Sequence, residues 1–216
     1  MRAVIFAGGP GIDADRVSSI ASECDIVIAA DSGADIACAC GILPQKVIGD
    51  FDSIDPQTKE FIKIKNIPVE LYPEEKDMTD SEICIKEIPA EAEVTLISSL
   101  SGRPDHVLSN MMMAIKMHAE GRDITITDGV NDFIPLNGPD EISISGIQDP
   151  DGLAISLIPF TEVKGVTSTG LYYPLEDMDL VPGSSLSVSN KVEQDSDSFS
   201  IRINSGKLGV LIVPAD

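Results

Sequence analysis

Residues 3–33 read AVIFAGGPGIDADRVSSIASECDIVIAADSG, and this stretch decides the fold. Two short apolar runs, Ala3–Ala7 and Asp25–Ala30, are typical of strands, and Asp15–Glu23 between them has the spacing of a helix. The glycine-rich segment that follows the first run indicates a turn. A strand, a helix and a second strand of these lengths predict a crossover unit with parallel strands.

The same alternation continues to about residue 138. Further strands are expected at Lys46–Ile48, Val69–Tyr72, Val94–Ser98 and Ile124–Thr127, and further helices at Gly33–Cys40, Pro56–Lys65, Asp80–Ile88 and Asp105–Glu120. Repeated alternation of this kind predicts a mostly parallel sheet covered by helices, a three-layer α/β domain. Ligands of such sheets bind beyond the carboxyl ends of the strands, so we look for a site there.

The pattern changes near Asn137-Gly138-Pro139-Asp140, after which helical spacing disappears. Short β-rich segments follow at Ile142–Ser145, Leu153–Ile158, Leu186–Val188, Ser198–Asn204 and Val210–Val213. Turns rich in glycine, proline and serine separate them. The sequence therefore predicts an α/β domain over residues 1–138 and a small all-β sandwich domain over residues 139–216.

Composition excludes several classes of protein. Fifteen Lys and Arg against 36 Asp and Glu give a formal net charge of −21 in 216 residues. Nucleic acids and anionic membranes need clustered basic residues, so neither is an expected partner. A hydrophobic fraction of 43% is enough for a folded core, and no apolar run approaches the ~20 residues of a spanning helix. We expect a soluble, cytoplasmic protein with reduced cysteines.

One glycine pattern supports an alternative interpretation. Gly9–Ala14 fits the G-x-G-x-x-G/A pattern after a strand, and Asp31 lies at the end of the next strand, where an acid would bind a ribose. Alone, these residues would indicate an NAD-dependent oxidoreductase. Pro10, however, interrupts the smooth entry of the turn into a helix, and the plainer interpretation is a glycine-rich turn.

Two pairs of aspartates follow predicted strands. Asp50 and Asp52 come after Lys46–Ile48, and Asp77 and Asp80 come after Val69–Tyr72. In an extended chain, Asp50 and Asp52 would point to one side while the residue between them turns into the fold. Carboxylates that converge at one sheet edge repel one another unless a divalent cation neutralises them, and oxygen ligands with room for phosphate suit Mg²⁺.

The segments around these acids allow other interpretations as well. Thr79 and Glu82 fit a helix capping box, in which Asp80 simply suits the helix dipole. Arg103 precedes a predicted helix and offers a rigid fork of donors to phosphate oxygens. Asp105 fits either this site or an N-cap, and His106 fits either the site or the plain surface.

Read together, four segments resemble the thiamine pyrophosphokinase family: Ala30–Asp35, Ile48–Ile54, Glu75–Asp80 and Gly102–His106. The second domain adds Gly170–Asp177 and the segment from Gly183 to Asn190. The resemblance covers nearly the whole chain. It implies an α/β catalytic domain, a C-terminal β-sandwich and a homodimer. The implied reaction transfers pyrophosphate from ATP to the hydroxyethyl group of thiamine and releases AMP.

The resemblance also implies roles for individual residues. The Mg²⁺ ligands are expected to be Asp50, Asp52 and Asp80, with Asp31 and Asp77 as further acids. The nucleotide side is expected to include Asp31, Thr79, Arg103, Asp105, His106 and Asn110. Thiamine is expected at a dimer interface, where the matching positions are Tyr173, Ser189 and Asn190. Ser32 and Pro104 depart from the usual family pattern.

Chemical reasoning leaves some questions open. Asp77 or Asp31 would accept the proton of the attacking hydroxyl. The same chemistry could act on another hydroxymethyl heterocycle, such as a pterin. A non-catalytic sensor of thiamine or nucleotide is a further alternative, against which the retained acids argue.

Overall fold

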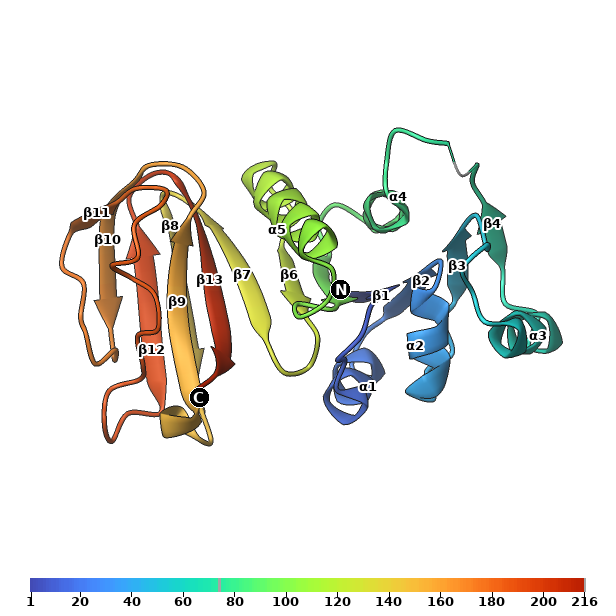
Figure 1. The fold of residues 1–216 in the computed structure, drawn as a ribbon, viewed down its shortest axis with the longest axis horizontal. Coiled ribbons are helices and arrows are strands. Elements are labelled where there is room, and N and C mark those ends of the chain that lie inside the picture. The colour runs from blue at the N-terminus through green and yellow to red at the C-terminus, as the bar shows by residue number, and fades with distance from the viewer. Residues whose placement is uncertain (74, 216) are drawn as a thin grey trace. The chain divides into compact units, whose positions relative to one another are not determined.

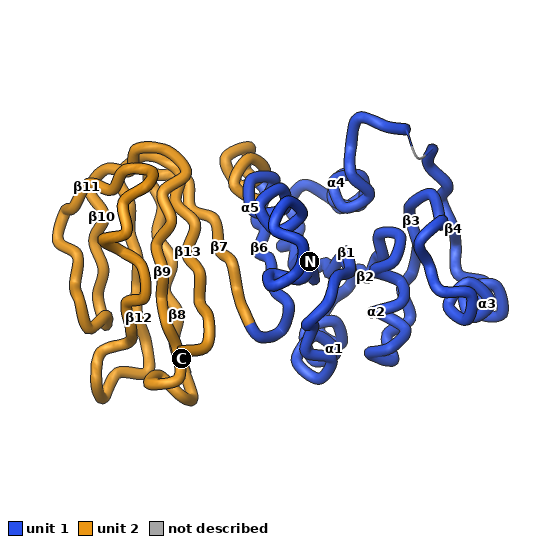
Figure 2. The backbone as a smooth tube through the Cα atoms, viewed as in Figure 1, with its two compact units in different colours: residues 1–113, 122–130 blue, residues 114–121, 131–216 orange. Residues whose placement is uncertain are grey.

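The computed structural model describes residues 1–73 and 75–215. It divides into two compact units (Figure 2): Met1–Met113 with Arg122–Val130, and Ala114–Gly121 with Asn131–Asp216. The division passes through helix α5 (Pro104–Ala119) and again ahead of strand β7 (Asp132–Asn137). The second division lies between residues 130 and 131. No helix in the described part of the chain is long and apolar enough to cross a membrane.

The first unit contains a parallel sheet in the order β4-β3-β2-β1-β5-β6. Its strands are β1 (Arg2–Gly8), β2 (Ile26–Ala30), β3 (Lys46–Gly49), β4 (Val69–Leu71), β5 (Glu93–Ser98) and β6 (Ile124–Thr127). Each neighbouring pair runs parallel. The expected strands are all present with small changes at their ends. All but the edge strand β4, which is largely exposed, come from apolar runs that are buried in the sheet.

Helices cover both faces of this sheet. Besides α5 they are α1 (Ala14–Ser22), α2 (Gly33–Ala39), α3 (Pro56–Ile64) and α4 (Asp80–Glu87). Figure 1 shows α1, α2 and α3 on one face and α4 on the other. Val4 and Phe6 of β1 pack in one apolar cluster with Val17 of α1 and Ala37 of α2, while Ile5 alternates to the opposite face and is also buried. The predicted three-layer α/β architecture is confirmed.

The second unit contains two antiparallel sheets. One has the order β7-β13-β9, with β13 at Lys207–Pro214 and β9 at Leu153–Pro159. The other has the order β11-β10-β12-β8, which are Met178–Leu180, Val163–Thr169, Ser198–Ile203 and Asp140–Ser145. A short 3₁₀ helix, η1 (Pro150–Gly152), precedes β9. Leu157 of β9 and Ile201 of β12 belong to one buried core shared by the sheets, so the predicted β-sandwich is confirmed.

Three strands of this unit escaped prediction, and one predicted strand is wrong. Strand β7 contains Pro135, which lowers strand propensity, and Gly165 (φ +65°) interrupts the alternation in β10. Strand β11 is only three residues long. Leu186–Val188 forms a turn: the two apolar side chains are exposed, while Ser187 is buried and its Oγ donates to the carbonyl of Leu157 at 2.8 Å.

Candidate active site

A cavity of about 580 Å³ lies in the first unit, at the carboxyl ends of β1, β2 and β5. Its walls come from the segments that follow these strands and from the start of α4. They include Gly8, Gly9, Asp31, Ser32, Thr79, Asp80, Ser98, Arg103, Asp105, His106 and Asn110. Parallel strands end at the same edge of a sheet, which is why residues far apart in the sequence meet here.

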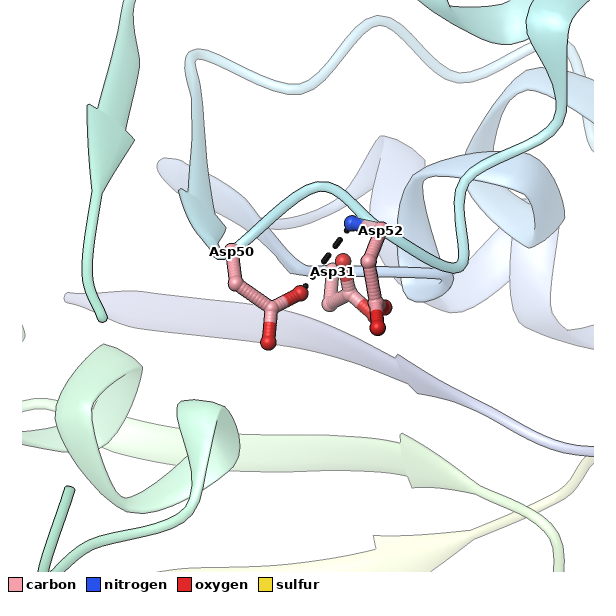
Figure 3. Close-up of side chains that lie close together, drawn as sticks. All are labelled: Asp31, Asp50 and Asp52. Carbon is pink, nitrogen blue, oxygen red and sulfur yellow. Dashed lines mark hydrogen bonds between the residues drawn. The ribbon is translucent and has the colours of Figure 1, made fainter. Parts of the chain in front are cut away.

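Three aspartates form a compact acidic cluster beside this cavity. One carboxylate oxygen from each of Asp31, Asp50 and Asp52 lies within 4.8 Å of the others (Figure 3). Asp31 follows β2 and the other two follow β3, its parallel neighbour. The amide of Asp31 donates to the carbonyl of Ile48 at 2.8 Å, so the two strand ends are in register.

The turn that carries Asp50 and Asp52 is left-handed rather than extended. Phe51 has φ +67°, and the amide of Asp52 donates to Asp50 Oδ1 at 3.1 Å (Figure 3). The expectation of an extended segment is therefore wrong. The expectation that Phe51 turns into the fold is confirmed, because its ring packs against the apolar cluster on the α1–α3 face of the sheet.

Asp31 is held firmly but keeps one oxygen available. It has φ +45°, and its Oδ2 accepts a hydrogen bond from the Ser53 hydroxyl. Its Oδ1 is buried and accepts no hydrogen bond from any residue that the structure describes. A buried acceptor without a donor calls for a cationic ligand or water. The oxygen-only donor set of Asp31, Asp50 and Asp52 fits Mg²⁺.

Asp80, an expected ligand, lies outside that three-residue cluster at the start of α4. Lys76 Nζ lies 3.2 Å from Asp80 Oδ1. Burial raises the pKa of Asp80; the ion pair with Lys76 opposes this, while the charges of Asp31 and Asp50 act in the same direction as burial. The cluster thus contains Asp31 where the expected ligand set has Asp80. Asp77 is exposed, and no interaction in the described chain connects it to the cluster.

Thr79 is the N-cap of α4, as the capping-box interpretation predicts. Its Oγ1 accepts from the amide of Glu82 at 3.2 Å. The carboxylate of Glu82 lies 3.8 Å from Lys86 Nζ, one turn further along the helix. This cap fixes the start of the helix, so Asp80 occupies its first turn and faces the cavity.

Arg103 and Asp105, which were expected on the nucleotide side, form a bidentate ion pair. The Nη2–Oδ2 distance is 2.6 Å and the Nε–Oδ1 distance is 3.2 Å. Both side chains are mostly exposed, and the guanidinium lowers the pKa of Asp105 to about 2. Because α5 begins at Pro104, Asp105 lies in the first helical turn, and its interpretation as an N-cap is wrong. His106 is exposed and lines the cavity.

Asn110 lies one turn further along α5 and also lines the cavity. Its Nδ2 donates to the hydroxyl of Ser98, at the end of β5, at 2.9 Å. Ser98 is buried. The hydrogen bond therefore joins the wall made by α5 to the end of a central strand and fixes the orientation of the Asn110 amide.

The second unit presents two tyrosines at its surface. The rings of Tyr172 and Tyr173 meet edge to face with centroids 4.8 Å apart, and 60% of Tyr173 is exposed. Ser189 is exposed with φ +58°. Asn190 differs from both, since it is buried and its amide bonds to the main chain of Tyr173. The structure thus places Asn190 behind the exposed residues.

One further residue was missed in the sequence. Asp128 directly follows β6, at the same edge of the sheet as the other acids, and its side chain is fully buried. An acid directly after the predicted strand Ile124–Thr127 was the available signal.

Both units match models of known protein families. Residues 17–126 match the family model described as thiamin pyrophosphokinase, catalytic domain. Residues 141–208 match the model described as thiamin pyrophosphokinase, vitamin B1 binding domain. The chain belongs to the thiamine pyrophosphokinase family. The resemblance inferred from the sequence motifs is therefore confirmed.

Individual members of this family are also similar to the chain in sequence and in fold. Thiamine pyrophosphokinase from Bacillus subtilis is 31% identical over 199 residues, which cover 91% of this chain and 92% of the relative. The crystal structure of thiamin pyrophosphokinase from Geobacillus thermodenitrificans superposes with a TM-score of 0.80 at 26% identity, covering 100% of this chain and 98% of that one. The Candida albicans enzyme, at 16% identity and a TM-score of 0.78 over 100% and 89% of the two chains, shows the shared fold. None of these matches favours an oxidoreductase or a pterin-specific enzyme.

Proposed function

We propose that this chain transfers the pyrophosphate group of ATP to the hydroxyl group of thiamine and releases AMP. One observation supports the proposal beyond family membership: the cavity is lined by Asp31, a member of the acidic cluster, by Asp80, and by Arg103 next to the start of a helix. A polyanionic nucleotide needs such local positive sites on a chain with net charge −21.

Asp31, Asp50 and Asp52 are the residues proposed to hold Mg²⁺, with Asp80 beside them. Bound there, the ion would neutralise phosphate charge as AMP departs. Arg103 would exchange the carboxylate of Asp105 for phosphate oxygens, because both accept the same bidentate fork. The cavity walls would hold the two substrates in line.

The reaction forms a bond between the thiamine hydroxyl oxygen and the β-phosphorus. It breaks the bond between that phosphorus and the oxygen bridging to the α-phosphorus, and AMP leaves with the electron pair. The hydroxyl proton passes to a carboxylate, for which Asp77 and Asp31 are the two candidates. Asp77→Asn distinguishes them: loss of the acidic limb of the kcat profile in this variant identifies Asp77 as the base, and an unchanged limb points to Asp31, which is also a proposed Mg²⁺ ligand.

Tyr173 and Ser189 are proposed to contact thiamine. The exposed ring of Tyr173 can stack on a pyrimidine, and an acidic protein suits the cationic thiazolium. The family resemblance further supports a homodimer with thiamine bound at its interface. A cytoplasmic location is proposed because the four cysteines are free thiols, as in reducing compartments.

The test measures AMP release from ATP and Mg²⁺, with and without thiamine. Wild type is expected to release AMP only with thiamine, and Asp52→Ala is expected to lose about 100-fold or more of the rate. Asp15→Ala, which removes an exposed carboxylate in α1 outside the cavity, serves as the matched control. If wild type released AMP with hydroxymethylpterin and not with thiamine, the assignment of thiamine as the substrate would be refuted. Undiminished activity in Asp52→Ala would overturn the proposed metal site.

A further inference from the structure

Asp128 is a fully buried acid whose carboxylate binds main-chain amides from two segments. Oδ2 accepts from the amide of Leu100 at 3.1 Å, and Oδ1 accepts from the amide of Val130 at 2.9 Å. The carbonyl of Asp128 also accepts from the amide of Asp13 at 2.8 Å. Asp128 therefore connects the end of β6 to the β5–α5 loop and to the loop that precedes α1.

These two loops form one wall of the cavity. The amide of Ser99 donates to the carbonyl of Gly8 at 3.2 Å. A Cβ atom added to Gly9 would lie 2.5 Å from Ser99 Cβ, and one added to Gly102 would lie 3.2 Å from Pro10 Cδ. The loops are thus in direct contact, with no space for a methyl group at Gly9. A displacement of the Leu100 main chain would therefore also displace the two loops that form this wall.

Arg103 depends on this wall for its position. It follows Leu100 in the same loop and immediately precedes α5. Its guanidinium is exposed and is bonded to Asp105, which belongs to the same short segment. This local ion pair cannot fix the loop relative to the sheet. The bond from Leu100 to the buried carboxylate of Asp128 can, because β6 is a strand of that sheet.

We propose that Asp128 is a positioning residue for the nucleotide: it fixes the Leu100–Arg103 loop so that Arg103 and the first amides of α5 meet the phosphates of ATP. The inference rests on the proposed function and deepens it. An ionised carboxylate offers acceptors on both oxygens, so it can serve Leu100 and Val130 at once. An amide offers only one acceptor oxygen.

Asp128→Asn tests this assignment with little change in shape. One of the two amides then faces an NH₂ group, and a buried donor without an acceptor destabilises its segment. We expect the KM for Mg·ATP to rise about tenfold, which corresponds to about 1.4 kcal/mol. The KM for thiamine and kcat are expected to change less than about threefold, because the residues proposed to hold thiamine and Mg²⁺ are unchanged. Asp128→Glu, which keeps both oxygens, should restore part of the ATP affinity.

Thr127→Val is the matched control. Thr127 is buried beside Asp128, and its Oγ1 accepts from the amide of Gly129 at 3.0 Å in the same turn, whereas the Leu100 amide donates to Asp128. We expect this variant to lower the melting temperature without changing the KM for Mg·ATP. The positioning role would be refuted if Asp128→Asn changed the KM for thiamine as much as the KM for Mg·ATP. It would also be refuted if Thr127→Val raised the KM for Mg·ATP as much as Asp128→Asn does.

Equilibrium binding separates this inference from the proposed function. The dissociation constant of Mg·ATP is measured by calorimetry on the folded wild type, Asp128→Glu and Thr127→Val, and on Asp128→Asn if it folds. If wild type failed to release AMP from ATP in the presence of thiamine, the proposed reaction would be refuted, while this measurement would still test Asp128. Weaker Mg·ATP binding in the Asp128 variants alone supports the inference. Unchanged binding in them would refute it.

Discussion

Asn190 binds both main-chain polar groups of Tyr173. Its Oδ1 accepts from the amide of Tyr173 at 3.1 Å, and its Nδ2 donates to the carbonyl of Tyr173 at 2.7 Å. The same Oδ1 accepts from the amide of Lys191 at 2.9 Å. The Asn190 side chain is buried while the ring of Tyr173 is exposed. The amide thus fixes the main chain of the turn and leaves the aromatic ring available for a ligand.

The first prediction concerns this turn. Asn190→Asp keeps the acceptor but cannot donate to the Tyr173 carbonyl, so the ring should lose its fixed position. We expect the KM for thiamine to rise about tenfold, from loss of roughly one hydrogen bond, with the KM for ATP unchanged. Steady-state kinetics in both substrates measure this. Ser187→Ala, which removes a nearby buried hydroxyl, is the control. Equal effects on both KM values would contradict the prediction.

A second prediction concerns Lys76, the cation that pairs with Asp80. Lys76→Met leaves Asp80 beside the charges of Asp31 and Asp50 with no opposite charge from Lys76. Without Mg²⁺ we expect the melting temperature to fall by about 2–4 °C, and addition of Mg²⁺ should raise it more than in wild type. Differential scanning fluorimetry measures both values.

The control for this prediction is Lys86→Met, because Lys86 pairs with Glu82 across an exposed part of the same helix. Exposed pairs of this kind contribute little, so its melting temperature should stay close to wild type. A Mg²⁺ response identical to wild type in Lys76→Met would show that Lys76 does not offset the acidic charge.

Arg122 provides a prediction about stability. Its guanidinium donates to the carbonyls of Ile85, Ile88 and Pro89 at 2.8–3.1 Å, so it satisfies the C-terminal end of α4. Arg122→Met is expected to lower the free energy of unfolding by about 2–3 kcal/mol, measured by urea titration. Arg2→Met, which breaks an exposed ion pair with Glu23, should change it by less than about 1 kcal/mol. Similar losses in both variants would show that capping is unimportant.

A further prediction concerns Cys84, which is fully buried in α4. Burial raises its pKa to about 12. At pH 8 the thiolate fraction is then about one in ten thousand, and iodoacetamide should modify Cys84 only after unfolding in urea. Mass spectrometry should find Cys24, Cys38 and Cys40 modified first. Rapid modification of Cys84 in the folded protein would contradict this burial.

The same shift fixes the sign of a pH effect. The thiol has an ordinary pKa of 9.0, so between about pH 9 and pH 12 the folded protein retains a proton that the unfolded chain loses. The contribution of Cys84 to stability must therefore decrease as the pH rises through this range. Urea titrations at pH 8 and pH 10 measure the direction.

The first unit could be predicted nearly completely because its strands, apart from the exposed edge strand β4, are buried in the sheet. Runs such as the residues of β1 and β2 are continuously apolar, and helical spacing fills the intervals between them. The second unit was harder, since β7 contains a proline and β10 contains a left-handed glycine. Such residues ordinarily end strands, and only pairing with a neighbouring strand overrides that tendency.

The sequence was sufficient to predict which acids belong to the site, but not which of them lie close together. Spacing placed Asp50 and Asp52 together, while their partner depends on the register between β2 and β3. That register brings Asp31 to the cluster, and Asp77, which follows β4, is exposed. Asp128 was missed because nothing in its local sequence shows which amide its carboxylate binds.

The left-handed turn at Phe51 has a consequence for how a divalent ion would enter and leave. Apolar packing of the aromatic ring, rather than ligation, fixes the main chain between Asp50 and Asp52. Because this turn is already formed, binding of a cation would not have to order any further part of the main chain. The affinity for different cations would then depend on their ionic radius and hydration rather than on folding of the loop. Exchange between Mg²⁺ and Mn²⁺ should accordingly proceed without backbone rearrangement.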